Sequence, residues 1–241
     1  ITSRQATHPI VHFHTLFSKK PFVGATMAIS SHLTLLTGIA GINVYIVRIL
    51  KLPFDISLHF YFFFFVGVII TGILKMFFYS SVGAGFLGTL GSSALLYVSI
   101  HWIILGNTIN IPLLYIQGLL LGFGASMTLV SGSMATLLDG DLKEAAQRSQ
   151  TMHTIRNFSA AMLIPIIAYT IKNHIQKGTQ SIYAENITDK MIYLKKLQDV
   201  AIDADHQIFL LMIIFNMVMF VSSIIQMILG KGRRITPPRE S

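Results

Sequence analysis

Six long apolar stretches, separated by short polar segments, occupy most of this sequence. They cover residues 22–47, 59–79, 82–105, 111–138, 152–171 and 208–229. A helix rises about 1.5 Å per residue, so it needs roughly 20 residues to cross a hydrocarbon core about 30 Å thick. Each stretch reaches that length. The sequence therefore predicts an all-α integral membrane protein with six transmembrane helices.

The composition agrees with this prediction. Hydrophobic residues make up 53% of the chain and charged residues only 12%, and the charges lie almost entirely between the stretches. Soluble domains average roughly 25% charged residues. Transmembrane β-strands would be short and alternating, so the long runs exclude a barrel. The net charge of +8 is spread over the loops instead of one soluble face, so nucleic-acid binding is not expected.

The stretches also predict how the chain is arranged around the membrane. A leading segment (1–21) and a basic tail (230–241) flank the bundle (22–229), and an even number of spans places both on one side. That side carries 11 Lys and Arg residues and the other side 7, so we expect both ends to be cytoplasmic. Residues 172–207 form the one sizeable outer loop. The helical spacing of Ile187, Met191 and Leu194 predicts a short helix lying on the membrane surface there.

Metal and thiol chemistry are not expected. The chain has no cysteine, which excludes disulfides, iron–sulfur ligation and thiol catalysis within it. His8, His12 and His14 lie close together in the leading segment, but no cysteine or nearby acid completes a set of metal ligands. We therefore expect no metal site and no cofactor.

The fourth stretch has two different faces when its residues are placed at about 100° intervals. One face carries small residues at helix-contact spacing: Gly118, Gly122 and Ala125. We expect it to pack against another helix, because small residues let backbones approach closely in lipid. The other face carries Gln117, Thr128 and Ser131, which we expect to line a substrate cavity. The two hydroxyls could equally be packing residues bonded to backbone carbonyls, whereas an amide in hydrocarbon needs a partner or water.

The first stretch adds Thr34 and Asn43 to the candidates for the cavity wall, on two different faces. It also contains His32, and the third stretch contains His101. An isolated histidine in a helix is more often hydrogen-bonded structure than a proton carrier, although ionisable residues inside membranes are functional suspects. All 10 acidic residues lie outside the six stretches. We therefore expect no carboxylate in this chain to carry protons at mid-membrane.

Arg156 lies in the first turns of the fifth stretch, next to Asn157, another candidate for the cavity wall. Its guanidinium could extend to the lipid headgroups. It could instead lock an inner gate by pairing with an acid of the preceding segment: Asp139, Asp141 or Glu144. The small residues that follow Arg156 would let such a neighbour approach, so the gate is our working hypothesis.

Three segments carry motifs that resemble those of a known protein family. The first is His8-Pro9 followed by residues 16–22 (LFSKKPF), the second is the Gly- and Ser-rich stretch 118–134 with the polar segment 139–150, and the third is residues 151–161 (TMHTIRNFSAA). The first resembles the cytoplasmic approach to the ninth span, and the third the start of the thirteenth span, of the fourteen-span drug:proton antiporters (EmrB/QacA type). These antiporters belong to the major facilitator superfamily. Nearly the whole chain is similar to their second half.

The resemblance implies that the six helices form the C-terminal lobe of a two-lobed transporter in the bacterial inner membrane, with a cavity between the lobes. The chain begins at Ile1, and we expect it to continue a longer polypeptide whose N-terminal half supplies the other lobe. The implied function is proton-coupled efflux of small hydrophobic or amphipathic compounds by alternating access, without enzymatic activity. The alternatives are a non-transporting membrane subunit and an integral membrane enzyme. An enzyme would need a cluster of catalytic side chains, which the sequence does not show.

Overall fold

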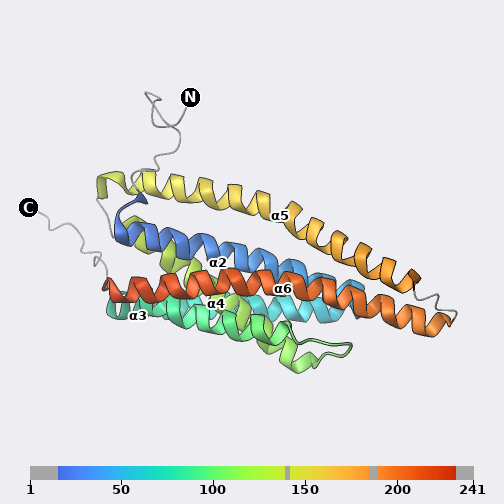
Figure 1. Ribbon diagram of the computed structural model, residues 1–241. Helices are drawn as coiled ribbons and strands as arrows, with labels where there is room; N and C mark the ends of the chain where they lie inside the picture. Colours follow the sequence, from blue (N-terminus) through green and yellow to red (C-terminus); the bar gives the residue numbers. More distant parts are fainter. Residues whose placement is uncertain (1–15, 139–141, 185–188, 232–241) are drawn as a thin grey trace, which may run out of the picture.

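Long helices make up nearly all of the computed structural model, which describes residues 16–138, 142–184 and 189–231 (Figure 1). Their order is α2 (Lys19–Asn43), the π-helix η1 (Val44–Ile49), α3 (Phe54–Trp102), α4 (Ile111–Leu138), the 3-10 helix η2 (Leu142–Glu144), α5 (Ala145–Ala184) and α6 (Lys190–Ile228). These described ranges contain no β-strand. Five helices, counting η1 with α2, are long and apolar enough to cross a membrane. The chain is therefore an all-α membrane protein, as the sequence predicts.

The predicted number of six separate helices is wrong, because two of the expected spans share one element. Residues 59–79 and most of 82–105 fall within α3, which has 49 residues and departs from helical geometry at Gly83 (φ 82°, ψ 170°). The polar segment between the two stretches, Ser80 and Ser81, is too short to form a loop, so it stays helical. The change of direction is concentrated in one residue whose backbone conformation is essentially restricted to glycine.

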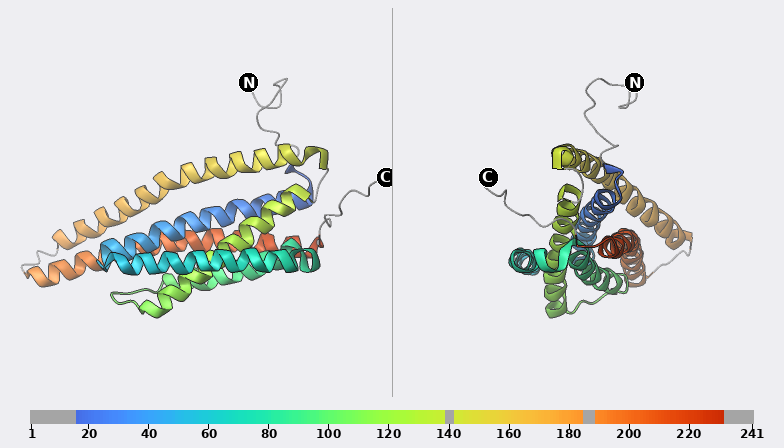
Figure 2. Two further views of the ribbon diagram at one scale, coloured as in Figure 1. Left: turned by 180° about the vertical axis from the view of Figure 1, so that it is seen from behind. Right: turned by 90° about the vertical axis from the view of Figure 1, so that its left-hand side faces the viewer.

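The two halves of α3 run in opposite directions along α4. Before Gly83, α3 runs parallel to α4, since the residue numbers of the contacts rise together in both helices: Phe60–Gly118 and Phe64–Gly122. After Gly83 they advance in antiparallel: Gly91–Gly124 and Trp102–Gln117. At about 1.5 Å per residue, the turn folds about 74 Å of helix into a hairpin. The two arms of this hairpin lie on either side of α4 (Figure 2).

Glycine lets the helix backbones touch where they cross. A Cβ on Gly24 of α2 would lie 2.8 Å from the carbonyl oxygen of Gly132 on α4. A Cβ on Gly85 of α3 would lie 2.2 Å from the backbone nitrogen of Met227 on α6. Helix association in lipid depends on such close contacts, because the lipid tails are as apolar as the side chains and give no hydrophobic drive.

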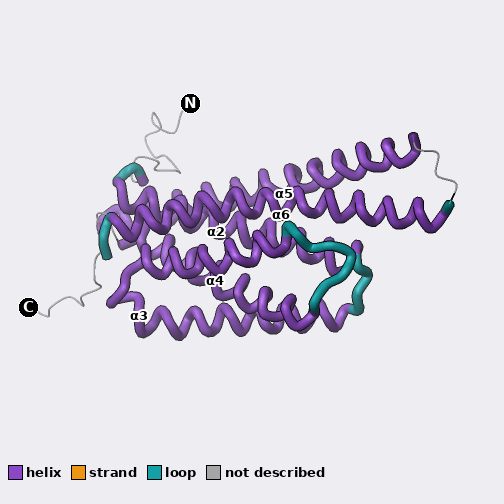
Figure 3. Tube along the Cα trace, turned by 60° about the horizontal axis from the view of Figure 1, so that its bottom comes forward, coloured by secondary structure: helices purple, strands orange, loops and turns teal. Residues whose placement is uncertain are grey.

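Helix α2 begins and α6 ends on the same side of the bundle, which we call the first end (Figure 1). The turn at Gly83 and the end of α4 lie there too. The π-helix η1, the start of α4 and the connections 50–53 and 103–110 lie at the opposite end, and Figure 3 shows these connections as loops. The helices therefore run alternately up and down when the two arms of α3 are taken separately.

Helices α5 and α6 continue far beyond the rest of the bundle at the opposite end (Figure 1). Residues 172–207 were expected to form an outer loop with a short surface helix; instead residues 172–184 complete α5 and residues 190–207 begin α6, while Ile187 lies outside the described residues. The two helices pair as an antiparallel hairpin, with Gly178 against Val200. Lys and Gln, which favour helix, are frequent in this part of the sequence. Asp189 caps the start of α6 by accepting a hydrogen bond from the backbone of Met191 at 2.8 Å.

Replacing Gly83 by alanine should destabilise the protein by about 1–3 kcal/mol, because its backbone conformation strains any L residue. An added Cβ would also lie 3.0 Å from the Cα of Lys231. Thermal unfolding of the purified protein in detergent measures the change as a lower midpoint. Gly72→Ala is the matched control, since it lies in the same helix with open space around its Cβ. Equal midpoints for the two variants would show that Gly83 is not required.

Candidate functional site

Polar side chains tie the helices together inside the bundle. Among the side-chain pairs that join different helices are Ser31–Thr128 (2.6 Å, α2 to α4), Trp102–Gln117 (2.8 Å, α3 to α4) and Asn216–Ser99 (3.0 Å, α6 to α3). All six side chains are buried. The amide of Gln117 thus has a partner for its oxygen, as an amide in an apolar interior requires.

The predicted cavity face of α4 is packed against other helices in this structure. Gln117, Thr128 and Ser131 are all buried. Gly124 lies on the same face, and a Cβ there would be 2.6 Å from the carbonyl oxygen of Gly91 on α3. The close approach of that backbone closes the face. Ser131 Oγ has no hydrogen-bond partner within the described part of the chain, and the same holds for Thr34 Oγ1 on α2.

The remaining predicted residues are spread over the bundle. Asn43 is half-buried at the end of α2 and hydrogen-bonds to Tyr61 of α3, whereas Asn157 is exposed on α5. The predicted contact face of α4 meets two helices, because Gly118 and Gly122 lie against α3 while the carbonyl of Ala125 accepts a hydrogen bond from Ser31 of α2 at 3.1 Å. Several candidates lie outside the described residues: His8, His12, His14, Asp139 and Asp141.

Arg156 lies on the side of α5 that faces α2. Its guanidinium is half-buried, and its Nε has no hydrogen-bond partner among the residues that the structure describes. It is close enough to His32 of α2 and to His153 of α5 to interact electrostatically with both. Glu144, one of its predicted partners, lies instead 3.7 Å from Arg148. The structure therefore places Arg156 in a group of basic side chains.

Arg148 is a buried structural residue that the sequence analysis missed. Its Nε donates to the carbonyl of Thr136, and its Nη2 donates to that of Leu137, at 3.0 Å each. These carbonyls belong to the last turn of α4, where helix carbonyls have no partner within the helix. A positive charge is also favourable at this end of a helix. No local pattern distinguished Arg148 from the other charged residues of its segment.

Two further charged residues lie on the helices: Lys75 within the predicted stretch 59–79, and Asp205 within the segment 172–207 that was expected to be an outer loop. Lys75 is part of α3, and its Nζ donates to the carbonyl of Ser126 on α4 at 2.7 Å. Asp205 is part of α6 and only 1% exposed. The expectation for Asp205 was wrong, because α6 begins well before the apolar stretch 208–229.

Helix α5 packs weakly against the rest of the bundle. Only 11% of its apolar segment is buried, against between 22% and 56% for the other four long helices. Its exposed large side chains include Phe158, Met162, Ile164 and Tyr169. Such an apolar face requires lipid or another protein surface to cover it.

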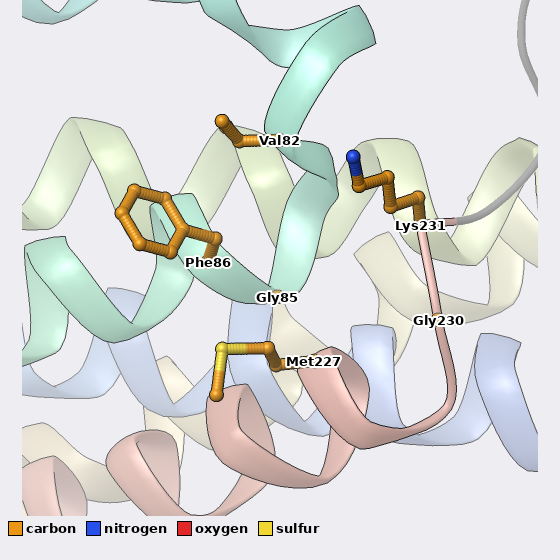
Figure 4. Close-up of a pocket in the computed structure, with 6 residues that line it drawn as sticks. All are labelled: Val82, Gly85, Phe86, Met227, Gly230 and Lys231. Carbon is orange, nitrogen blue, oxygen red and sulfur yellow. The ribbon is translucent and has the colours of Figure 1, made fainter.

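Two pockets lie away from the predicted cavity residues. One, of about 290 Å³, lies at the first end between the turn of α3 and the end of α6, and Figure 4 shows its lining: Val82, Gly85, Phe86, Met227, Gly230 and Lys231. The other, of about 360 Å³, lies between α5 and α6 in the projecting hairpin. It is lined by His174, Lys177, Gly178, Ser181, Val200 and Asp203.

Arg148→Gln should lower the stability by about 2–3 kcal/mol, because the two carbonyls that close α4 lose charged hydrogen-bond donors. Arg148→Lys should recover only part of this, since an ammonium group cannot reproduce the planar fork of the guanidinium. The midpoint of thermal unfolding in detergent gives the comparison. Lys195→Gln, at an exposed position on α6, controls for the loss of one positive charge. If Arg148→Gln and Lys195→Gln unfold at the same temperature, the cap is unimportant.

Comparison with models of known protein families finds no match, and comparison with curated proteins finds none either.

Proposed function

We propose that this chain is one lobe of a secondary transporter that exports hydrophobic or amphipathic compounds in exchange for protons by alternating access. In this proposal each arm of α3 crosses the bilayer, so that the bundle has six crossings. The start of α2 and the end of α6 then both face the cytoplasm. The second lobe is supplied by another part of the same polypeptide. The single observation that carries the proposal is the position of Arg156.

Arg156 lies well away from the first end along the length of the bundle, with its side chain half-buried. Arg148 marks the level at which α4 ends, and Arg156 follows it by eight residues, which is about 12 Å along a helix. Between them, Met152 packs with Ala25 and Ala28 of α2. A charged side chain at this depth in a membrane faces protein or water rather than lipid, and such residues commonly belong to substrate or ion pathways.

The surroundings of Arg156 leave room for a second lobe. Helix α5 is the least buried of the long helices, and its exposed surface next to Arg156 includes the polar Asn157 as well as the apolar Phe158. An amide in contact with lipid alone would be costly. We therefore assign this surface of α5 to the interface between the lobes, with Arg156 and Asn157 at the border of the substrate cavity.

The structure also suggests how the cavity could enlarge. The buried hydroxyls of Thr34 and Ser131 have no hydrogen-bond partner within the described residues, and unpaired polar groups are costly while they stay buried. A movement of α5 and α2 that opened this interior would expose them to water or substrate. Pro165 within α5 removes one backbone hydrogen bond from the middle of that helix and would ease its bending.

A second candidate function is that of a non-transporting membrane subunit. The observation in its favour is the projecting hairpin of α5 and α6, which carries the exposed apolar residues Tyr183, Met191 and Ile192. Such a hairpin could dock a partner outside the membrane. Transport by the reconstituted protein separates the two functions, because a docking subunit would move no substrate.

Arg156→Gln should reduce transport at least about tenfold, equivalent to about 1.4 kcal/mol in the barrier, because the cavity loses its charge. The assay uses the complete natural protein in proteoliposomes with an imposed proton gradient and a fluorescent lipophilic cation as the probe. Arg156→Lys should keep part of the activity, and Lys172→Gln, an exposed cation on the same helix, should keep all of it. Transport by Arg156→Gln at the wild-type rate, with the same pH dependence, would refute the role of Arg156.

A further inference from the structure

Asp205 is a buried acid without a partner. It lies on α6, is only 1% exposed, and neither of its carboxylate oxygens has a hydrogen-bond partner among the described residues. Its neighbours along the same helix include the buried Ile202, Ile208 and Phe209. An ionised carboxylate removed from water without any partner is very unfavourable. The packed arrangement around Asp205 therefore suits a neutral carboxylic acid.

The titratable groups around Asp205 do not neutralise it. Tyr45 of η1 interacts with it electrostatically, but the Tyr45 hydroxyl is used in a hydrogen bond to the carbonyl of Gly106. On α6, the exposed Asp203 lies 4.0 Å from His206. Asp203 also lines the pocket that His174 and Lys177 of α5 share, on a different side of the helix from Asp205. Arg48, on the same element as Tyr45, is exposed.

Asp205 lies where several elements close the opposite end of the bundle. Three hydrogen bonds hold the segment after α3 against η1 and α6: Tyr45 to the Gly106 carbonyl, His206 to the Leu105 carbonyl (2.7 Å) and Asn107 to Asp199 (3.3 Å). The element that carries Tyr45 is a π-helix, a geometry that is uncommon in proteins and is frequently found at functional sites. While these contacts hold, Asp205 is closed off from water.

We propose that Asp205 is a proton-binding site: it holds a proton while this end of the bundle is closed, and it releases the proton when η1 and α6 separate and admit water. This inference rests on the proposed transport function. It adds to that function by placing the carboxyl that carries the exchanged proton within this chain.

Infrared difference spectroscopy of the complete protein in detergent tests this directly, because a protonated carboxyl has a carbonyl band that disappears when the proton leaves. The band should be lost as the pH is raised in the wild type. Above about pH 6, where ordinary exposed carboxyls are ionised, the remaining band should be missing in Asp205→Asn and retained in Asp203→Asn, the matched exposed acid on the same helix. A band of the same size in Asp205→Asn and the wild type would overturn the proposal.

The pH dependence of thermal unfolding gives a second readout. The folded protein keeps Asp205 neutral whereas the unfolded chain lets it ionise in water, so the unfolding midpoint of the wild type should fall as the pH rises. As the pH rises, the unfolding midpoint of the wild type should therefore fall relative to the midpoint of Asp205→Asn, because asparagine stays neutral at every pH. Parallel curves would contradict proton binding. Neither measurement involves transport, so a failure here is distinguishable from a failure of the Arg156 experiment.

Discussion

Direct contact between helix backbones is the interaction on which this bundle depends. Lipid offers no hydrophobic drive between helices, so close packing must supply the attraction. A methyl group added to Gly24 would collide with the backbone of Gly132, and one added to Gly85 would collide with the backbone of Met227. Gly83 also keeps the bundle compact, because α3 reverses its direction at this residue without a loop.

In the tightly packed interior, some polar groups have a hydrogen-bond partner and others do not. Some are paired across helices, as Trp102 is with Gln117, and these pairs fix the helices relative to one another. Others, such as the carboxyl of Asp205 and the Nε of Arg156, are left without a hydrogen bond in the described part of the chain. Buried unpaired groups favour any arrangement that gives them a partner. The proposed movements at the two sites follow from this preference.

Much of the helical framework was predictable from hydrophobicity. The expected fourth span, 111–138, coincides with α4, and the small residues at 118 and 122 do lie against another helix. The ends of α5 and α6 were not predictable in this way, because polar residues such as Lys172 continue a helix as readily as apolar ones outside the membrane. For the same reason the sequence placed Asp205 in an outer loop.

The sequence by itself determined the class of the protein and the positions of its apolar helices, because a span needs only length and apolar character, which are local properties. Only the tertiary structure decided which polar side chains are paired, such as Asn216 with Ser99. It also decided that the carboxyl of Asp205 is closed off from water while that of Asp203 is not. Those outcomes depend on which helices meet, and residues distant in the sequence meet only after the bundle has packed.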